Sequence, residues 1–528
     1  MSAGGLLTGL LTAIVVLTLV AKLVRTPYPV VFVIGGSLLG LIPGTPQVVL
    51  DPNLVFLLFL PPLIFGDGWT TDVRAFVLYR KPILLLAIGL VVFTSVCVAF
   101  AARWLLGFPL ALGFVLGAIL SPTDAVATDA VAEELSLPRR MAAILNGESL
   151  VNDASGLVIY AFAVTAVLTG AFSLGFALLQ FVYVVVAGIA IGIGGGALSG
   201  WIAAKIRDSG LSDELISVSI SLVTPFALYV PADAVHASGV LAALSGGMVL
   251  SRKSNRIFDA NSRIAASAVW NLLFFTFNGA AFVLVGLQLR TIVGALGVYR
   301  PATLAAWSLG IAAVVIAARF AWLFGVSRLR RALAPRSTAL EGPPPSWRVT
   351  FIMGTAGMRG VVSLAAALAL PVNFPHRDLI LFTVFVVIVV TLVGGGLLMP
   401  LLIRRWNIVE NEDALLQNMA LARVRMAEAV RSRMRELEPS ISLPAEWEVV
   451  GRLTADYAAR IAHYSAHADG SLDPDLDATQ HEIEARWRRE AFRAERRALL
   501  EMRGAGTISD EAYRRMEWQI DLAESRLE

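Results

Sequence analysis

Long apolar segments recur through the first 403 residues of this 528-residue chain, and they limit its possible folds more than any other feature. A helix needs about 20 mostly apolar residues to cross the hydrocarbon core of a bilayer. Because backbone groups in that core must be satisfied internally, each such segment predicts a transmembrane helix. We expect about thirteen, at 4–24, 28–43, 50–66, 82–103, 109–132, 140–169, 174–204, 212–231, 234–251, 263–289, 301–326, 349–371 and 378–403.

Composition agrees with an all-α polytopic membrane protein that ends in a soluble tail. Hydrophobic residues make up 57% of the chain and charged residues only 16%, and the mean hydropathy is +0.71. Of the 40 acidic residues, 16 lie in residues 1–403 and 24 in residues 404–528. We therefore predict a transmembrane domain at 1–403 and a helical cytoplasmic tail at 404–528.

Lysine and arginine predict the orientation of these helices. With the N-terminus outside, the loops on the inner side hold 18 basic residues and those on the outer side hold four. Positive charge collects on the cytoplasmic side of membrane proteins. We expect a multi-pass protein of the cell (inner) membrane, with its N-terminus outside and its tail in the cytoplasm.

Thirteen helices divide into two groups of six with one helix between them, and the second group then enters the membrane from the opposite side. Two inverted six-helix repeats of this kind are common in secondary transporters, where paired helix interruptions mark the substrate site. Interruptions are predicted at 121–124, where Pro122 breaks the helix, and at the glycine-rich 354–360. The fifth helix of each group is therefore expected to be discontinuous.

Four carboxylates lie in or near these interrupted, apolar segments: Asp124, Asp129, Glu148 and Asp153. A charged side chain at the bilayer centre costs roughly 2.5–3.5 kcal/mol on insertion scales and usually marks an ion or proton path. The alternative is that these acids cap helix breaks or pair with arginine. For Asp129 the interpretation as a solvated helix end is preferred over a role in an access funnel.

Oxygen donors beside these acids predict a site for a hard monovalent cation. Ser149 and Asp153 are four residues apart and share one face of a helix. Carboxylate, hydroxyl and carbonyl oxygens suit such a cation, and no soft ligand accompanies them. We predict Na⁺ at Asp124, Ser149 and Asp153, with Thr123 as a further ligand.

Other polar residues are assigned supporting roles. Glu148 is expected to pair with Arg359 and so tie its helix to the second interruption, because a buried guanidinium needs a counter-charge. Asn152 is expected either to orient Asp153 or to bridge a backbone break. Arg319 is expected to reach the cytoplasmic interface and pack there. Asp67 either extends the cation path or marks the membrane boundary, and the sequence leaves both open.

Motifs for other classes of protein are missing from the sequence. It has no P-loop, no HExxH and no dinucleotide fingerprint, so we expect neither an enzyme, nor ATP-driven transport, nor a bound cofactor. Basic residues sit in short loops where topology explains them, so nucleic-acid binding has no support.

Several segments resemble the sodium/proton exchanger family, in the branch of bacterial NhaP-type and animal plasma-membrane exchangers. They are LPPLIFGDGW at 60–69, GAILSPTDAVA at 117–127, LNGESLVNDASG at 145–156, FNGAAFVLVGLQL at 277–289 and GMRGVVSLAAALALP at 357–371. The resemblance implies a thirteen-helix fold with two crossed, broken helices. It also implies a homodimer and an elevator-like movement of a core against a dimerisation domain.

Carried onto this sequence, the resemblance makes Asp153 the central ion- and proton-binding acid, with Thr123, Asp124 and Ser149 as ligands. It makes Glu148 and Arg359 a structural ion pair. Asn152 before Asp153 is typical of the electroneutral branch, because electrogenic relatives have a second Asp there. Many members carry an acid directly after the Phe of the PPLLF segment, where this chain has Gly66 and then Asp67.

The expected activity is exchange of Na⁺, Li⁺ or K⁺ for H⁺ across the cell membrane, by alternating access, with a role in pH homeostasis. Burial and a nearby carboxylate favour the protonated form of Asp153 whereas Na⁺ favours the ionised form, so the two compete. Partners are the alkali cations, H⁺, membrane lipids and a second copy of the chain. Alternatives are a K⁺-preferring antiporter, and a channel or transport-dead sensor on the same fold.

Overall fold

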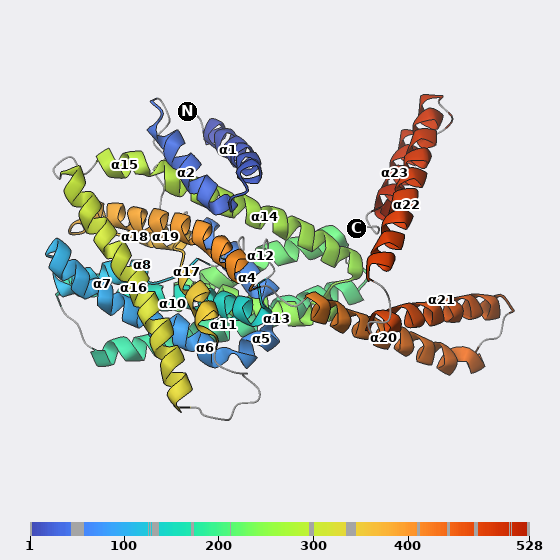
Figure 1. The fold of residues 1–528 in the computed structure, drawn as a ribbon, viewed down its shortest axis with the longest axis horizontal. Helices are drawn as coiled ribbons and strands as arrows, with labels where there is room; N and C mark the ends of the chain where they lie inside the picture. The colour runs from blue at the N-terminus through green and yellow to red at the C-terminus, as the bar shows by residue number, and fades with distance from the viewer. Residues whose placement is uncertain are drawn as a thin grey trace. The chain divides into compact units, whose positions relative to one another are not determined.

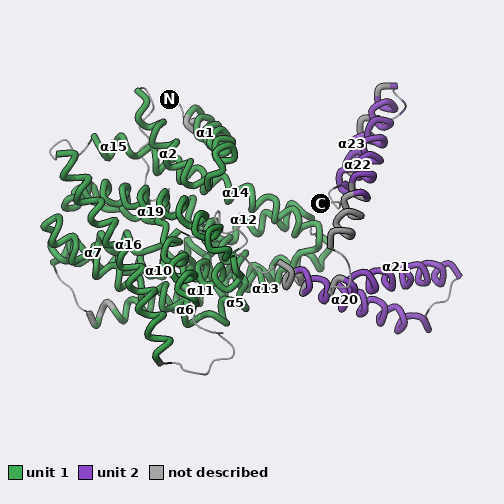
Figure 2. The backbone as a smooth tube through the Cα atoms, viewed as in Figure 1, with its two compact units in different colours: residues 1–409 green, residues 410–528 purple. Residues whose placement is uncertain are grey.

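The fold is described from a computed structural model, and the described part of the chain contains helices and no strands. The chain divides into two compact units, Met1–Val409 and Glu410–Glu528 (Figure 2). The described residues are 3–43, 57–124, 126, 128, 137–170, 174–211, 213–294, 300–333, 345–408, 412–440, 444–468, 474–505, 507 and 509–524.

The first unit is a bundle of long and short helices (Figure 1). Among the described residues, eight helical stretches are long and apolar enough to cross a membrane. Described helices occupy every predicted segment in whole or in part, while the total of thirteen and the inverted repeats stay predictions. The elements are α1 (Ala3–Val24), α2 (Tyr28–Leu41), α4 (Leu60–Thr70), α5 (Val73–Leu78), α6 (Arg80–Leu84), a π-helix η1 (Leu85–Leu90), α7 (Val91–Leu106), α8 (Leu110–Leu120), α10 (Arg139–Thr169), α11 (Leu174–Asp208), α12 (Glu214–Ala234), α13 (Gly239–Ile257), α14 (Ala260–Leu287), α15 (Leu289–Gly294), α16 (Pro301–Leu333), α17 (Trp347–Thr355), α18 (Val361–Leu368) and α19 (Arg377–Trp406).

Side-chain caps define where several of these helices begin. Asp213, Ser238 and Asp259 each accept a hydrogen bond from a backbone N–H in the first turn of α12, α13 and α14. Ser346 does the same for α17. Capping satisfies a donor that the helix itself leaves unpaired, so these residues place the helix starts at loops.

Buried apolar side chains form one large core and two smaller ones in this unit. The large core joins α7, α8, α10, α16 and the segments α17–α19. The smaller cores gather around α13, which packs against both α4 and α11. The interrupted helices therefore lie in the large core, and α4 borders it.

The two predicted interruptions are present and touch each other. After α8 ends at Leu120, residues 121–124 are not helical, and a second break separates α17 from α18. The backbone N–H of Asp124 donates to the carbonyl of Met358 at 2.8 Å, and Thr128 Oγ1 donates to the carbonyl of Ala356 at 3.2 Å. Groups freed by each break are thus satisfied by the other break, as irregular backbone at membrane depth requires.

The second unit contains two pairs of packed helices. In the second pair, Leu499, Tyr513 and Ile520 form a small buried cluster, and Arg496 lies within ion-pair distance of Asp521 and Glu524. The elements are α20 (Glu412–Leu437), a 3₁₀ turn η2 (Glu438–Ser440), α21 (Pro444–Ala468), α22 (Pro474–Gly504) and α23 (Asp510–Glu524).

Candidate cation site

A small cavity lies where α4, α10, α14 and α18 surround the first interruption. Its volume is about 50 Å³, whereas one water needs roughly 10–15 Å³. A monovalent cation with part of its water shell therefore fits. The cavity brings together five residues singled out from the sequence: Asp67, Thr123, Asp124, Ser149 and Asp153.

One face of α10 supplies the centre of this cavity. Ser149 and Asp153 both line it, as expected from their spacing of one helical turn. Ser149 is buried and Asp153 is partly exposed to the cavity. The Ser149 hydroxyl lies 3.4 Å from that of Thr123, which comes from the interruption after α8. Oxygen atoms from two elements thus converge on one side of the cavity.

Asn152 supports this arrangement from behind. Its amide Nδ2 donates to Thr123 Oγ1 at 2.7 Å, and Thr123 Oγ1 in turn donates to Glu148 Oε1 at 3.3 Å. All three side chains are buried. Neither Asn152 nor Glu148 lines the cavity. The amide therefore bonds to a residue of the first interruption, the second of its two expected roles, and not to Asp153.

Asp124 is fixed between the two interruptions. Its Oδ1 accepts from the backbone N–H of Val126 at 2.9 Å, while its own N–H bonds to Met358. A Cβ built on Gly360 would lie 1.4 Å from Asp124 Oδ2, so only glycine leaves room for this carboxylate. Since α18 begins at Val361, the carboxylate sits at a helix N-terminus, whose partial positive charge attracts anions.

The expected pairing of Glu148 with Arg359 is wrong, because the direct partner of Glu148 is Arg319. Arg319 NH1 lies 2.5 Å from Glu148 Oε1, and NH2 donates to Oε2 at 3.0 Å. Only 1% of Arg319 is exposed, so it does not reach the membrane interface as predicted. The cause is the length of α16, which continues to Leu333 and so places Arg319 deep in the bundle.

Arg359 stabilises both interruptions by hydrogen bonds to backbone carbonyls. Its Nε donates to the carbonyl of Leu120 at 3.0 Å and its NH1 donates to the carbonyl of Gly357. Its backbone N–H donates to Thr391 Oγ1 at 3.2 Å. Because Leu120 ends α8, this guanidinium lies against the partial negative charge of a helix C-terminus.

Asp67 connects the small cavity to a larger one. The larger cavity has a volume of about 370 Å³ and lies between α4, α5 and α10. Asp67 lines both cavities, whereas Asp72 and Asn146 line the larger one alone. At Gly66, a Cβ would lie 1.5 Å from an atom of the Phe274 ring, so no larger side chain fits at that position. In this packing, Asp67 is the acid that α4 presents to both cavities.

Two site residues were missed and one predicted residue falls outside the described part. Asn278 of α14 lines the small cavity and is buried; the signal was an amide inside an apolar segment. Ser363 of α18 also lines it, but a serine in a small-residue helix gave no distinct signal. Asp129 lies outside the described residues.

Comparison with known proteins identifies the family that this geometry belongs to. The family described as "Sodium/hydrogen exchanger, transmembrane" matches residues 10–404. The chain belongs to the sodium/hydrogen exchanger family. It is therefore a multi-pass membrane transporter of the monovalent cation:proton antiporter class, not an enzyme, and this class requires no cofactor.

Individual relatives agree with this family. The chain is 31% identical over 528 residues to the uncharacterized Na⁺/H⁺ exchanger YjcE of Escherichia coli, covering 95% of this chain and 94% of that one. It is 33% identical over 436 residues to the sodium, potassium, lithium and rubidium/H⁺ antiporter of Bacillus pumilus, covering 79% and 64%. The antiporter MjNhaP1 of Methanocaldococcus jannaschii has a similar fold, with a TM-score of 0.57, 18% identity and coverage of 76% and 98%.

Proposed function

We propose that this exchanger moves Na⁺ or another alkali cation against H⁺ across the cell membrane, at one site centred on Asp153 that opens alternately to each side. The main support is the shared cavity of Asp153, Asp124, Ser149 and Thr123 beside two touching helix interruptions. These donors are hard oxygens, the ligands that alkali and other hard cations prefer.

Competition for one carboxylate couples the two fluxes. A carboxylate in a desolvated cavity near another acid favours its neutral, protonated form, whereas a bound cation favours the ionised form. Asp153 therefore holds either a proton or, together with Ser149 and Asp124, a cation. Because each form can be carried to the opposite side, the gradient of one ion drives the other without ATP.

The buried charges around the site support an electroneutral cycle. Glu148 is held by both terminal nitrogens of Arg319, and Asn152 is neutral and engaged with Thr123. Asp153 is then the single carboxylate of α10 that is free of an ion pair and lines the cavity. One proton leaves as one monovalent cation binds, so no net charge moves.

Access from the cytoplasm is proposed through the larger cavity, past Asp72 and Asn146 to Asp67. The Oδ1 atom of Asn146 is buried without a hydrogen-bond partner among the described residues, so it offers a free acceptor along this route. The arginines that begin α10 lie at the same end and favour a cytoplasmic location for it. With basic residues on the cytoplasmic side, we propose that 1–403 is the membrane domain and that 404–528 is a cytoplasmic tail.

K⁺ is the second candidate substrate. The Bacillus pumilus relative is named for sodium, potassium, lithium and rubidium, and it is 33% identical to this chain over 436 residues. Oxygen ligands hold each of these ions, so selectivity depends on the size of the cavity. We propose Na⁺ as the first cation to test and K⁺ as its direct comparison. We also propose that the working unit is a homodimer, as the family resemblance implies.

Exchange by purified protein in liposomes tests the proposal. An imposed gradient of Na⁺, Li⁺ or K⁺ should move H⁺ in the opposite direction, as read by a pH-sensitive dye inside the vesicles. Asp153→Asn should abolish this movement, whereas Asp378→Asn, a matched change of an exposed acid on α19, should not. Cation-driven proton movement that persists in Asp153→Asn would rule out a site centred on Asp153.

The same liposomes test electroneutrality. Moving one elementary charge across 100 mV involves about 2.3 kcal/mol, so an electrogenic cycle responds strongly to voltage. The rate of exchange should stay the same when a potential is imposed with an ionophore. A rate that changes severalfold with potential would show that the cycle carries net charge.

A further inference from the structure

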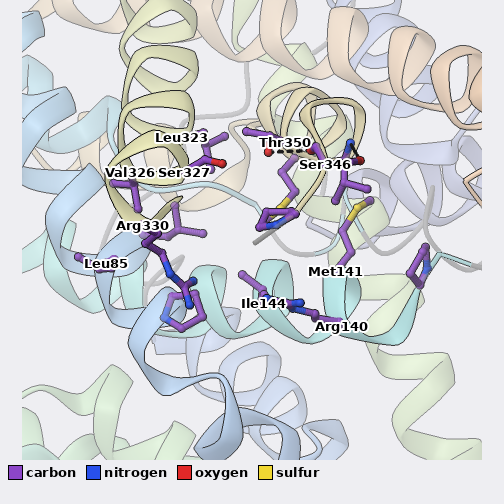
Figure 3. Close-up of a pocket in the computed structure, with 16 residues that line it drawn as sticks. Leu85, Arg140, Met141, Ile144, Leu323, Val326, Ser327, Arg330, Ser346 and Thr350 are labelled. Atoms are coloured by element: carbon purple, nitrogen blue, oxygen red, sulfur yellow. Dashed lines mark hydrogen bonds between the residues drawn. The ribbon is translucent and has the colours of Figure 1, made fainter. Parts of the chain in front are cut away.

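A separate cavity of about 310 Å³ lies among α6, η1, α10, α16 and α17 (Figure 3). It shares no lining residue with the cation cavity or with the access cavity. Its walls are mostly apolar, formed by side chains such as Leu86, Met141, Ile144, Leu323 and Met353. Ligand pockets usually have volumes of about 300–1,000 Å³. This cavity is at the lower end of that range, so it can hold a small ligand or one part of a larger ligand.

One buried polar group in this wall has no partner. The hydroxyl oxygen of Ser327 is buried and makes no hydrogen bond among the described residues, and the residue lines the cavity beside Leu323 and Val326 (Figure 3). A buried hydroxyl without a hydrogen-bond partner destabilises the folded protein. A ligand with an oxygen acceptor would remove this destabilisation.

Two arginines also line the cavity. They are Arg140, in the first turn of α10, and Arg330, in the last turns of α16. In Figure 3, Arg330 lies on α16 next to Val326 and Ser327, and Arg140 lies on α10 near Ile144. The lining residues include no acid. A guanidinium group binds phosphate well, because its fork of donors matches the phosphate oxygens.

We propose that this cavity binds an anionic phospholipid. Its phosphate is held by Arg140 and Arg330, a glycerol-ester oxygen accepts from Ser327, and part of one acyl chain fills the apolar space. Apolar surface of the cavity wall is also exposed, since Leu85, which lines it, is 40% exposed. The rest of the lipid can thus stay in the surrounding bilayer. Charge and apolar surface together favour a lipid over a soluble anion.

An occupant of this cavity would brace the helices that hold the buried ion pair. Met353 lines the cavity, and its backbone carbonyl accepts from Arg319 Nε at 3.1 Å. Leu323, also in the wall, follows Arg319 by one helical turn. Since Arg319 pairs with Glu148 on α10, bound lipid connects α10, α16 and α17. We therefore expect it to stabilise the folded protein.

The test measures lipid binding to the full-length purified protein in a neutral detergent, and it does not depend on transport. Phosphatidylglycerol should raise the thermal unfolding temperature in a saturable way, and native mass spectrometry should show bound lipid. Phosphatidylcholine with the same chains, and inorganic phosphate alone, should have little effect. An equal shift with phosphatidylcholine, or a full shift with phosphate, would overturn the proposal.

Variants locate the site. Arg140→Gln with Arg330→Gln should weaken phosphatidylglycerol binding by roughly thirtyfold, the loss expected for two arginines that attract an anionic lipid. The control, Arg328→Gln with Arg348→Gln, removes the same charge from exposed positions of α16 and α17 that do not line the cavity. Ser327→Leu should fill the cavity and block binding without lowering the stability of the lipid-free protein. Equal weakening by both arginine pairs would show only general attraction to charge and would contradict the site.

Discussion

Two buried arginines and one buried glutamate lie in the first unit, and the two arginines have different partners. Arg319 takes the carboxylate of Glu148, and Arg359 takes the carbonyl groups of Leu120 and Gly357. Gly357 lies against both, since a Cβ there would lie 2.3 Å from Arg319 Cδ and 2.9 Å from Arg359 NH1. Through Gly357, the ion pair of Arg319 and Glu148 is therefore packed against Arg359, which bonds to the end of α8. We expect these contacts to hold α10 next to the candidate cation site.

This assignment predicts the outcome of a double-mutant cycle. Removing one partner of a buried ion pair costs roughly 3–5 kcal/mol, because the other charge is left uncompensated. Glu148→Gln and Arg319→Gln should therefore each destabilise the protein strongly, and the double variant should be much more stable than the sum of the two losses implies. Thermal unfolding of the detergent-solubilised protein provides the measurement.

The matched comparison is the cycle of Glu148→Gln with Arg359→Gln. Arg359 bonds to backbone carbonyls and not to Glu148, so its coupling to Glu148 should be clearly weaker. Stronger coupling to Arg359 than to Arg319 would restore the pairing expected from the sequence and contradict the geometry described above.

The sequence predicted those parts of the site whose residues lie close together in the chain. It did not predict contacts between residues far apart in the chain. Ser149 and Asp153 share a face because helical periodicity fixes it, and Pro122 marks the first interruption through local chemistry. The partner of Glu148 depends on how α16 packs beside it, which no local pattern contains. Likewise, the contact between Gly66 and the Phe274 ring depends on the packing of α4 against α14, which the sequence does not show.

At the scale of elements, the helices follow the apolar segments, but their ends and interruptions depend on single residues. The segment predicted as one helix at 82–103 is divided into α6, the π-helix η1 and α7. Such π-turns occur often at functional sites, and η1 packs against α10, which carries Ser149 and Asp153. Helix starts, in contrast, are set by caps such as Asp259, which lies outside the membrane-spanning segments.

Asp259 gives a pH-dependent prediction. Its hydrogen bonds with Ser262 hold the pKa of the Asp259 carboxyl below its usual value. A lowered pKa in the folded state means that the ionised carboxylate stabilises α14 above the unfolded value of about 4, and that this contribution is lost as pH falls further. Asp259→Ala should cost about 1 kcal/mol at pH 7, the usual loss of an N-cap.

Asp259→Asn separates the charge from the cap. Asparagine also caps helices but does not titrate, so this variant should be slightly less stable than the wild type at pH 7, and the difference should shrink as the pH falls below about 4. Unfolding temperatures recorded across this range test the sign. A stability difference that grows as the solution is acidified would be inconsistent with a stabilising carboxylate.

At the scale of the whole molecule, the chain divides into two units of different character, Met1–Val409 and Glu410–Glu528. The first unit holds the family match, both interruptions and every residue of the cation cavity. The second is a charged helical unit whose contacts include exposed ion pairs such as Arg433 with Glu436. Exposed pairs of this kind contribute little, typically under about 1 kcal/mol. All the chemistry of exchange is thus assigned to the first unit.

The central claim is that a cation and a proton compete for Asp153, and proton release on cation binding measures this directly. Isothermal titration of the purified protein with Na⁺, in buffers of different ionisation enthalpy, gives the number of protons released per ion bound. At a pH where Asp153 is protonated in the empty site, the value should approach one, and Asp153→Asn should abolish saturable binding. Saturable Na⁺ binding that releases no proton at any pH would contradict the competition.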